Sequence, residues 1–312
     1  MRILKAVCHL GVDQMLKAAL GDQLTIWRCR TPEGKPKDLT FWVPSLPFDT
    51  VDSVENDGWD VVIYDDIPTR ESLRNIKARA AIWYVHGTYH TWRGFQIYAN
   101  EHLQNVHVLF PDLSRRRHVM SWYQHQPLSE LILPVHLSSQ YFTPVPQHRN
   151  GRCFVMGNEL KKTIALYGGL SLAQVVLCGL QWYPFDFFGY GLEDLVPQEF
   201  YRGVAYPIRD TVVNHSVSVN PSLVETLGFV LLECMASGVP IITTPKINLP
   251  EELSGRSYVI ARTPAQFLEW SEKLVRDEAL SITMGNAGQK FLREVFPFAS
   301  YQGQLKEWLA QM

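Results

Sequence analysis

Short apolar, β-branched runs alternate along the chain with segments of helical period. In the first half, apolar runs span residues 3–8, 24–27, 59–64 and 81–85, and a helical segment at 12–20 follows the first run. Strands that alternate with helices usually form a parallel sheet that those helices cover. The pattern therefore predicts an α/β fold.

The alternation lapses between Leu133 and Asn150, a stretch with three prolines that is typical of a linker. We therefore expect a first domain at residues 1–143 and a second at 144–297. In the second domain, apolar runs recur at residues 153–156, 175–180, 185–188, 217–219, 241–243 and 258–260. Helical segments at 264–276, 279–295 and 300–310 follow, and we expect residues 298–312 to return to the first domain.

The composition is that of a folded protein, with 46% hydrophobic, 12% aromatic and 19% charged residues. Lys and Arg number 29 against 31 Asp and Glu, a formal net charge of -2. The chain therefore lacks the cationic field of a general nucleic-acid binder. We expect no nucleic-acid partner.

The five cysteines are scattered, mostly inside apolar runs, and no CxxC pair is present. This usage indicates reduced packing residues and a cytoplasmic location, and it gives no sign of zinc. No stretch approaches the roughly 18 apolar residues of a membrane span, so we expect a soluble protein.

The most informative stretch is HSVSVNPSLVETLGFVLLECMASGVPIITTPKINLPEE, residues 215–252. HSVSVN alternates with period two, LGFVLLECMAS is long enough for three helical turns, and Gly238 supplies a helix stop before the apolar VPIITT. We expect a strand–helix–strand unit. Ligands of such units bind beyond the carboxyl ends of the strands, where the loops at 221–226 and 245–252 would face one crevice.

The start of this predicted helix is a candidate anion site. The helix begins near Leu227, so its free N–H groups and the positive end of its dipole point into the crevice. Gly228 lets an anion approach the backbone closely. A phosphate group would be stabilised there.

Glu233 is the exception in a helix that is apolar nearly all round. A carboxylate in that position must be paired or hydrogen-bonded, because leaving it bare costs several kcal/mol. Sugar hydroxyls near a strand end are one kind of partner. A structural salt bridge with a nearby Lys or Arg is the other.

PSLVETLGFVLLECMASGVPII and the Pro250–Glu251 pair resemble the signature PSxxExFGxxxxEAMAxGxPVI, followed by proline and glutamate, of retaining GT-B glycosyltransferases, especially glycosyltransferase family 4. Glu225 and Glu233 are separated by seven residues, as in that family's paired-glutamate motif. The resemblance implies a GT-B fold, in which two Rossmann-like domains face each other across a cleft, with the donor held mainly by the second.

The resemblance also implies roles for single residues. Glu225 would contact hydroxyls of the donor sugar, and Glu233 would hold the nucleotide ribose. Backbone N–H groups of Leu227, Gly228 and Phe229 would meet sugar or phosphate, and we place the neighbouring Thr226 among the donor-binding residues.

The family opens its second domain with a GR…K motif whose cations neutralise the donor pyrophosphate, and here that place reads CFVMGNELKKT. Gly157 is kept and Asn158 stands where the arginine is expected. Lys161 and Lys162 are the candidate cations, with Lys162 assigned to stabilise the leaving group. Two solvated surface lysines are the alternative, and Arg152 could supply the missing charge.

Two glycine-containing segments are further candidates. FFGYGLED at residues 187–194, which contains Tyr190, resembles the glycine-rich turn that borders the nucleotide base pocket. Gly11 occupies the first strand–helix turn, where acceptor or diphosphate would bind, although a glycine there can serve only the turn.

His86 ends an apolar run where family members often carry a histidine near the transferred sugar; a packed histidine is equally compatible. His86 and His90 follow a strand and Gly87, so we assign no metal. The basic cluster Ser114–Arg115–Arg116–Arg117–His118 could bind an anionic acceptor or lipid headgroups, but a solvated face is the favoured interpretation.

Taken as a member of this family, the chain would transfer a sugar from a nucleotide-diphosphate sugar with retention, without metal or other cofactor. The acceptor, a carbohydrate, a lipid-linked compound or a small molecule, stays open, as does peripheral membrane contact. A catalytically inactive module that binds sugar nucleotides or partners is the rival interpretation, because Asn158 replaces an arginine. Glycosylation of nucleic acid conflicts with the charge balance.

Overall fold

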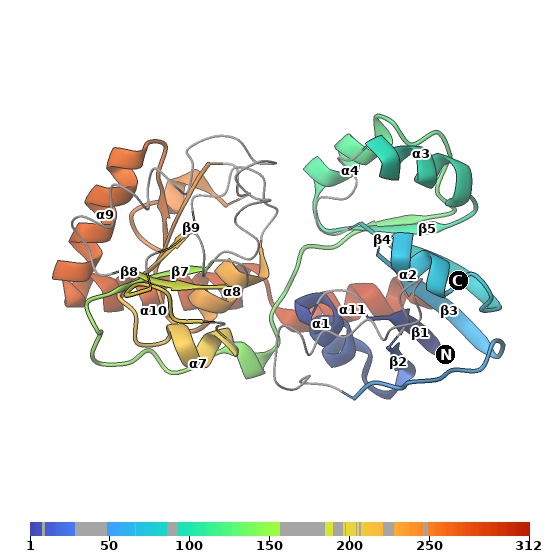
Figure 1. The fold of residues 1–312 in the computed structure, drawn as a ribbon, viewed down its shortest axis with the longest axis horizontal. Helices are drawn as coiled ribbons and strands as arrows, with labels where there is room; N and C mark the ends of the chain where they lie inside the picture. The colour runs from blue at the N-terminus through green and yellow to red at the C-terminus, as the bar shows by residue number, and fades with distance from the viewer. Residues whose placement is uncertain are drawn as a thin grey trace. The chain divides into compact units, whose positions relative to one another are not determined.

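The computed structural model describes residues 1–7, 10–28, 49–65, 67–85, 93–156, 185–189, 196, 198–203, 205, 207–220, 228–245, 247 and 249–312. The chain divides into two compact units. One comprises residues 1–136 and 299–312, and the other comprises residues 137–298. Each unit has its own parallel sheet (Figure 1).

The first unit contains a six-stranded sheet in the order β2-β1-β3-β4-β5-β6. All neighbouring strands are parallel, which confirms the α/β fold expected from the apolar runs. The strands are β1 (Ile3–Ala6), β2 (Leu24–Trp27), β3 (Trp59–Tyr64), β4 (Ala78–Tyr84), β5 (His107–Phe110) and β6 (Glu130–Ile132). The helices between them are α1 (Leu10–Leu20), α2 (Ile67–Ser72), α3 (Arg93–His102) and α4 (Leu113–Met120).

Large aromatic side chains fill part of the core of this unit. Trp83 of β4 is 1% exposed, and its ring lies 5.7 Å from that of Phe95 and 5.5 Å from that of Tyr123. Such aromatic contacts stabilise beyond the area that they bury. They attach α3 and the segment after α4 to the sheet.

The last helix, α11 (Phe298–Leu309), packs on the first unit. Its Gln302 side chain donates to the carbonyl of Ala19 at 2.9 Å, and the Trp308 indole donates to Ser129 Oγ at 3.0 Å. Tyr301 and Leu305 are buried on the same helix.

The second unit contains a five-stranded sheet in the order β11-β10-β9-β7-β8, also parallel throughout. Its strands are β7 (Cys153–Met156), β8 (Phe185–Phe188), β9 (Val217–Asn220), β10 (Ile241–Thr243) and β11 (Val259–Ile260). The helices in the described part of this unit are α7 (Ile208–Val212), α8 (Phe229–Ala236), α9 (Pro264–Arg276) and α10 (Glu278–Val295). The apolar run at residues 175–180 lies outside the described residues.

The chain divides between residues 136 and 137, whereas the expected linker boundary was at residue 143. The reason is local hydrogen bonding to the second unit. Arg209 of α7 donates to the carbonyl of Gln140, and the backbone N–H of Thr143 donates to the carbonyl of Ala236 at the end of α8. These bonds hold residues 137–143 on the second unit.

Candidate functional site

The predicted strand–helix–strand unit is present as β9, α8 and β10. β9 and β10 are adjacent and parallel, with Asn220 at the end of β9 opposite Thr243 at the end of β10. Because α8 connects these strands, its N-terminus follows the carboxyl end of β9. This is the edge at which α/β sheets bind ligands.

Helix α8 begins directly after Gly228. Gly228 is the N-cap residue, with extended backbone, and having no side chain it makes no side-chain cap bond to the helix. Gly228, Phe229 and Val230 are partly exposed, while the next two residues are buried. The first N–H groups of a helix have no intrahelical acceptor, and the helix dipole favours an anion beside them by about 0.3–1 kcal/mol.

Glu233 is the only charged residue of α8 and lies just over one turn from its N-terminus. In the described part of the chain no side chain donates a hydrogen bond to its carboxyl or forms an ion pair with it. The salt-bridge alternative from the sequence is therefore not realised among these residues.

Burial is the larger influence on the pKa of Glu233 and raises it, while the charge of Arg209 on α7 lowers it. That guanidinium bonds elsewhere, to the Gln140 carbonyl at 2.5 Å and to Asp210 at 3.3 Å. Removal of the Glu233 carboxyl from water has the larger effect and raises its pKa to about 8, although part of the residue reaches solvent. A protonated Glu233 can both donate and accept a hydrogen bond.

Sequence reasoning did not identify Arg209. It lies on a short helix, 24 positions before Glu233, and no motif links the two. Only the packing of α7 against α8 brings them together.

Three of the other predicted site residues lie in the described part of the chain, and the rest do not. Gly11 is the second residue of α1, in the first unit, and Gly228 and Phe229 begin α8 in the second. The remaining candidates lie outside the described residues, namely His86, Gly157, Asn158, Lys161, Lys162, Tyr190, Glu225, Thr226 and Leu227.

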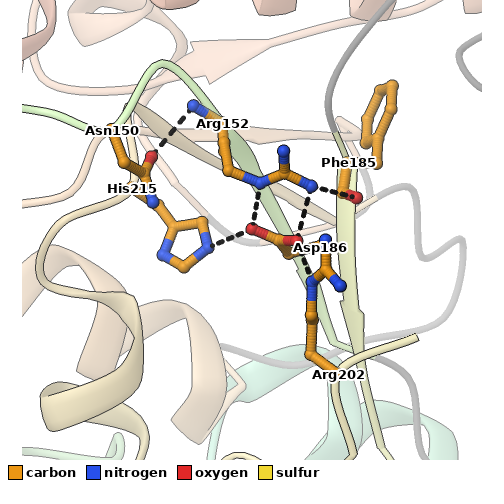
Figure 2. Close-up of polar contacts among 6 residues, drawn as sticks. All are labelled: Asn150, Arg152, Phe185, Asp186, Arg202 and His215. Atoms are coloured by element: carbon orange, nitrogen blue, oxygen red, sulfur yellow. Dashed lines mark hydrogen bonds and ion pairs between the residues drawn. The ribbon is translucent and has the colours of Figure 1, made fainter. Parts of the chain in front are cut away.

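The Arg152 guanidinium is paired with the Asp186 carboxylate (Figure 2). Its Nε and Nη2 donate to the two carboxylate oxygens of Asp186 at 2.5 and 2.7 Å. Arg152 directly precedes β7, so this pair is at the amino edge of the sheet, opposite the N-terminus of α8. Asp186 neutralises the charge of Arg152. The pair also lies at the amino edge of the sheet, whereas a leaving diphosphate would bind at the carboxyl edge.

Asp186 of β8 is the centre of this cluster (Figure 2). It also accepts from Arg202 Nε at 2.5 Å and lies 3.1 Å from His215 Nε2. Burial alone would raise the pKa of Asp186, but hydrogen bonds from Arg152, Arg202 and His215, together with the charge of Arg152, hold it below the ordinary value. The cluster joins β8 to the segments before β7 and β9, which is a structural role.

The basic cluster of the first unit is mostly occupied. Asp112 caps α4 through the backbone N–H of Arg115, whose own side chain is buried. Arg116 pairs with Glu130 at 2.5 Å, which leaves Arg117 exposed. A single exposed arginine is a weak basis for binding lipid headgroups.

Among the residues that the structure describes, no group of three or more His, Cys, Asp or Glu could hold a metal ion. In that same part of the chain, no helix is long and apolar enough to cross a bilayer. Cys153 and Cys234 are free thiols buried in the second unit.

Comparison with known proteins connects this geometry to a family. Residues 192–277, which contain β9, α8 and β10, match the model of the family described as "Glycosyl transferases group 1". No curated protein matches the sequence of the chain.

Solved structures resemble the whole chain. HepE from Anabaena, crystallised with UDP and glucose, is similar over 100% of both chains with 12% identity and a TM-score of 0.72. The sucrose-phosphate synthase of Thermosynechococcus elongatus matches 100% of this chain and 99% of its own, with 12% identity and a TM-score of 0.67. The fold is GT-B.

A mutant of TarM from S. aureus, in complex with Fondaparinux, alpha-GlcNAc-glycerol and UDP, has a TM-score of 0.61 at 12% identity. The match covers 80% of this chain and 54% of TarM, so the chain spans about half the length of that protein. Likenesses at such identities show the GT-B fold alone. With the family match at residues 192–277, they support a glycosyltransferase.

Proposed function

We propose that this chain transfers a sugar from a nucleotide-diphosphate sugar to an acceptor, with retention of the anomeric configuration and without a metal ion. The observation that carries the proposal is the start of α8, which follows the carboxyl end of β9 and lies about one turn from a Glu233 carboxyl with which no side chain in the described part of the chain pairs. Retention and a place in glycosyltransferase family 4 rest on the resemblance of residues 221–242 to that family's signature.

The donor would lie along the first turns of α8. The N–H groups after Gly228 receive the diphosphate, while Glu233 contacts the ribose hydroxyls about 7 Å further along the helix. A carboxyl that is neutral before binding can donate to one ribose oxygen and accept from the other. Glu225 contacts the sugar hydroxyls, and Thr226, Leu227 and Phe229 complete the donor contacts.

The chemical step breaks the bond between the anomeric carbon and a diphosphate oxygen and forms a bond from that carbon to an acceptor oxygen. The acceptor proton passes to a donor phosphate oxygen on the same face. Negative charge develops on the leaving diphosphate, where the α8 N-terminus and Lys162 or Lys161 stabilise it. His86 serves near the transferred sugar.

UDP is the first nucleotide to test, because HepE was crystallised with UDP and glucose and TarM was crystallised with UDP. The acceptor is a carbohydrate, a lipid-linked compound or a small molecule. We also propose a cytoplasmic location, on the basis of the cysteine usage.

A catalytically inactive sugar-nucleotide-binding module is the second candidate function. Asn158 stands in place of the family arginine, and the ion pair of Arg152 with Asp186 removes the nearest substitute cation. Donor binding without turnover is the behaviour expected of such a module.

Calorimetry with UDP-glucose, UDP-N-acetylglucosamine and GDP-mannose, together with a donor-hydrolysis assay in EDTA, tests the proposal. We expect binding of at least one donor and slow transfer to water that EDTA leaves unchanged. Donor binding with neither hydrolysis nor transfer to any acceptor offered would favour the inactive module. Inversion of the anomeric configuration, followed by NMR of the product, would rule out retention.

A further inference from the structure

Lys5 is a fully buried lysine in the middle of β1. Its side chain and that of Asp13 are both 0% exposed. Lys5 Nζ lies 2.8 Å from Asp13 Oδ1, forms an ion pair with Asp65 and donates to the carbonyl of Ala6 at 3.1 Å. These contacts join residues from three elements of the first unit.

The three side chains meet near the carboxyl ends of β1 and β3, where the ligand-binding loops of parallel α/β sheets begin. Lys5 is one residue from the carboxyl end of β1, Asp13 is in the first turn of α1, and Asp65 directly follows β3. β1 and β3 are neighbours in the sheet, with Lys5 opposite Ile63. The ion pairs therefore tie the start of α1 and the end of β3 to the carboxyl edge of β1.

Stability alone does not account for this cluster. Removing a charged group from water costs several kcal/mol, and well-packed apolar residues often replace buried ion pairs without loss of stability. An ion pair also restricts geometry, because Asp13 can reach Lys5 Nζ only when α1 lies within a narrow range of positions. The cluster thus fixes the position of the α1 start more narrowly than an apolar contact would.

Gly11, a proposed ligand contact, lies two residues before Asp13 on the same turn. Asp13 also places a negative charge at the start of α1, and Lys5 shares its single positive charge between Asp13 and Asp65. We propose that Lys5 and Asp13 are positioning residues that hold the first turn of α1, with Gly11, in place for the transfer reaction. This inference rests on the proposed function but concerns the unit that does not contain α8.

Two isosteric variants with the same change of charge test the inference. Asp13→Asn removes the negative charge on α1 that pairs with Lys5 and leaves the Lys5–Asp65 ion pair, whereas Asp65→Asn removes the charge after β3 and leaves the Lys5–Asp13 ion pair. The first readout is hydrolysis of UDP-glucose. We expect kcat to fall about 10-fold in Asp13→Asn, because a displaced contact slows chemistry, while KM stays within about 2-fold because α8 still binds the donor. Asp65→Asn should keep kcat within about 2-fold.

The second readout is amide hydrogen exchange at residues 14–17, whose N–H groups bond to the carbonyls of residues 10–13. Exchange there should rise about 10-fold in Asp13→Asn and stay unchanged in Asp65→Asn. Equal effects of the two variants, or no effect of Asp13→Asn, would overturn the inference.

If Asp13→Asn does not fold, the neutral triple variant Lys5→Met/Asp13→Asn/Asp65→Asn replaces it, with the same expected results. If the wild-type protein hydrolyses none of the sugar nucleotides named above, the proposed function fails by itself. Amide exchange at residues 14–17 then still tests whether Asp13 holds the first turn of α1, while the role of this turn in transfer fails with the proposed function.

Discussion

The backbone of Gly285 in α10 lies directly against the carbonyl group of Gly238, the residue that terminates α8. A Cβ atom at position 285 would lie 1.8 Å from the Gly238 oxygen. The same oxygen accepts from Arg149 Nη2 at 2.5 Å, and Gly238 itself has a φ of 70°. This close approach fixes the end of the helix whose other end is the proposed diphosphate site.

Gly285→Ala should therefore be strongly destabilising. The new methyl group overlaps a backbone carbonyl that cannot rotate away, so we expect a loss of about 3 kcal/mol or more in the free energy of unfolding. Gly303→Ala in α11 is the matched control, because nothing lies within 4 Å of its Cβ position. It should gain about 0.5–1 kcal/mol, since alanine favours a helix. Urea unfolding measures both, and equal stabilities would contradict the close contact.

Asp186→Asn should weaken the second sheet. It removes the carboxylate that accepts from Arg152, Arg202 and His215. We expect a loss of about 3 kcal/mol at pH 7, the low end for a broken buried pair, because both arginines reach water. Glu272→Gln, which breaks an exposed pair with Arg276, should change stability by less than about 0.5 kcal/mol.

The loss in Asp186→Asn should also depend on pH. The pKa of Asp186 is below its ordinary value of 3.8 in the folded protein, so its contribution is complete above pH 3.8. It disappears as the pH falls through the lower pKa of the folded state. The wild-type and variant stabilities should converge in strong acid, and a difference that persists there would show that packing, not charge, is the cause.

The elements of the two sheets could be predicted from the sequence because their signals are local. The apolar runs at residues 59–64, 185–188 and 241–243 coincide with β3, β8 and β10. Helix α8 was expected from near Leu227 and is described from Phe229, after the N-cap Gly228. Strand order depends on contacts between distant segments, and no local pattern encodes it.

The surroundings of charged side chains could not be predicted in the same way. Lys5 reads as one polar residue within an apolar run, and Asp65 reads as the end of another. Their burial together with Asp13 arises only when β1, β3 and α1 assemble. From the sequence, Arg152 is a candidate cation for the diphosphate. Its pairing with Asp186 could not be foreseen, because Asp186 is 34 residues away along the chain.

The buried carboxyl of Glu233 predicts an unusual dependence of stability on pH. Its pKa is about 8 in the folded protein against an ordinary 4.5. Between these values the folded state binds more protons than the unfolded state, so wild-type stability should fall as the pH rises through this window. Gln cannot ionise, so Glu233→Gln avoids the free energy that ionising a buried carboxyl costs the folded state.

Glu233→Gln should thus match the wild type at pH 4.5 and exceed it at pH 8. The full shift corresponds to ~5 kcal/mol, and we expect a gain of about 2 kcal/mol because water still reaches part of the residue. Thermal unfolding across pH 4.5 to 8 provides the measurement, with Glu272→Gln as the exposed control. Parallel curves for wild type and Glu233→Gln would show that Glu233 ionises normally.

Substitutions of the paired glutamates should separate catalysis from donor binding. Glu225→Ala removes a contact to the transferred sugar, where charge develops, so we expect kcat to fall about 100-fold or more with little change in KM. Glu233→Ala removes hydrogen bonds to the ribose, so the Kd for UDP should rise about 10–100-fold. Glu233→Gln keeps hydrogen-bonding atoms and should retain most of the affinity. Hydrolysis kinetics and calorimetry with UDP give these values, and wild-type activity in both alanine variants would end the assignment of this site.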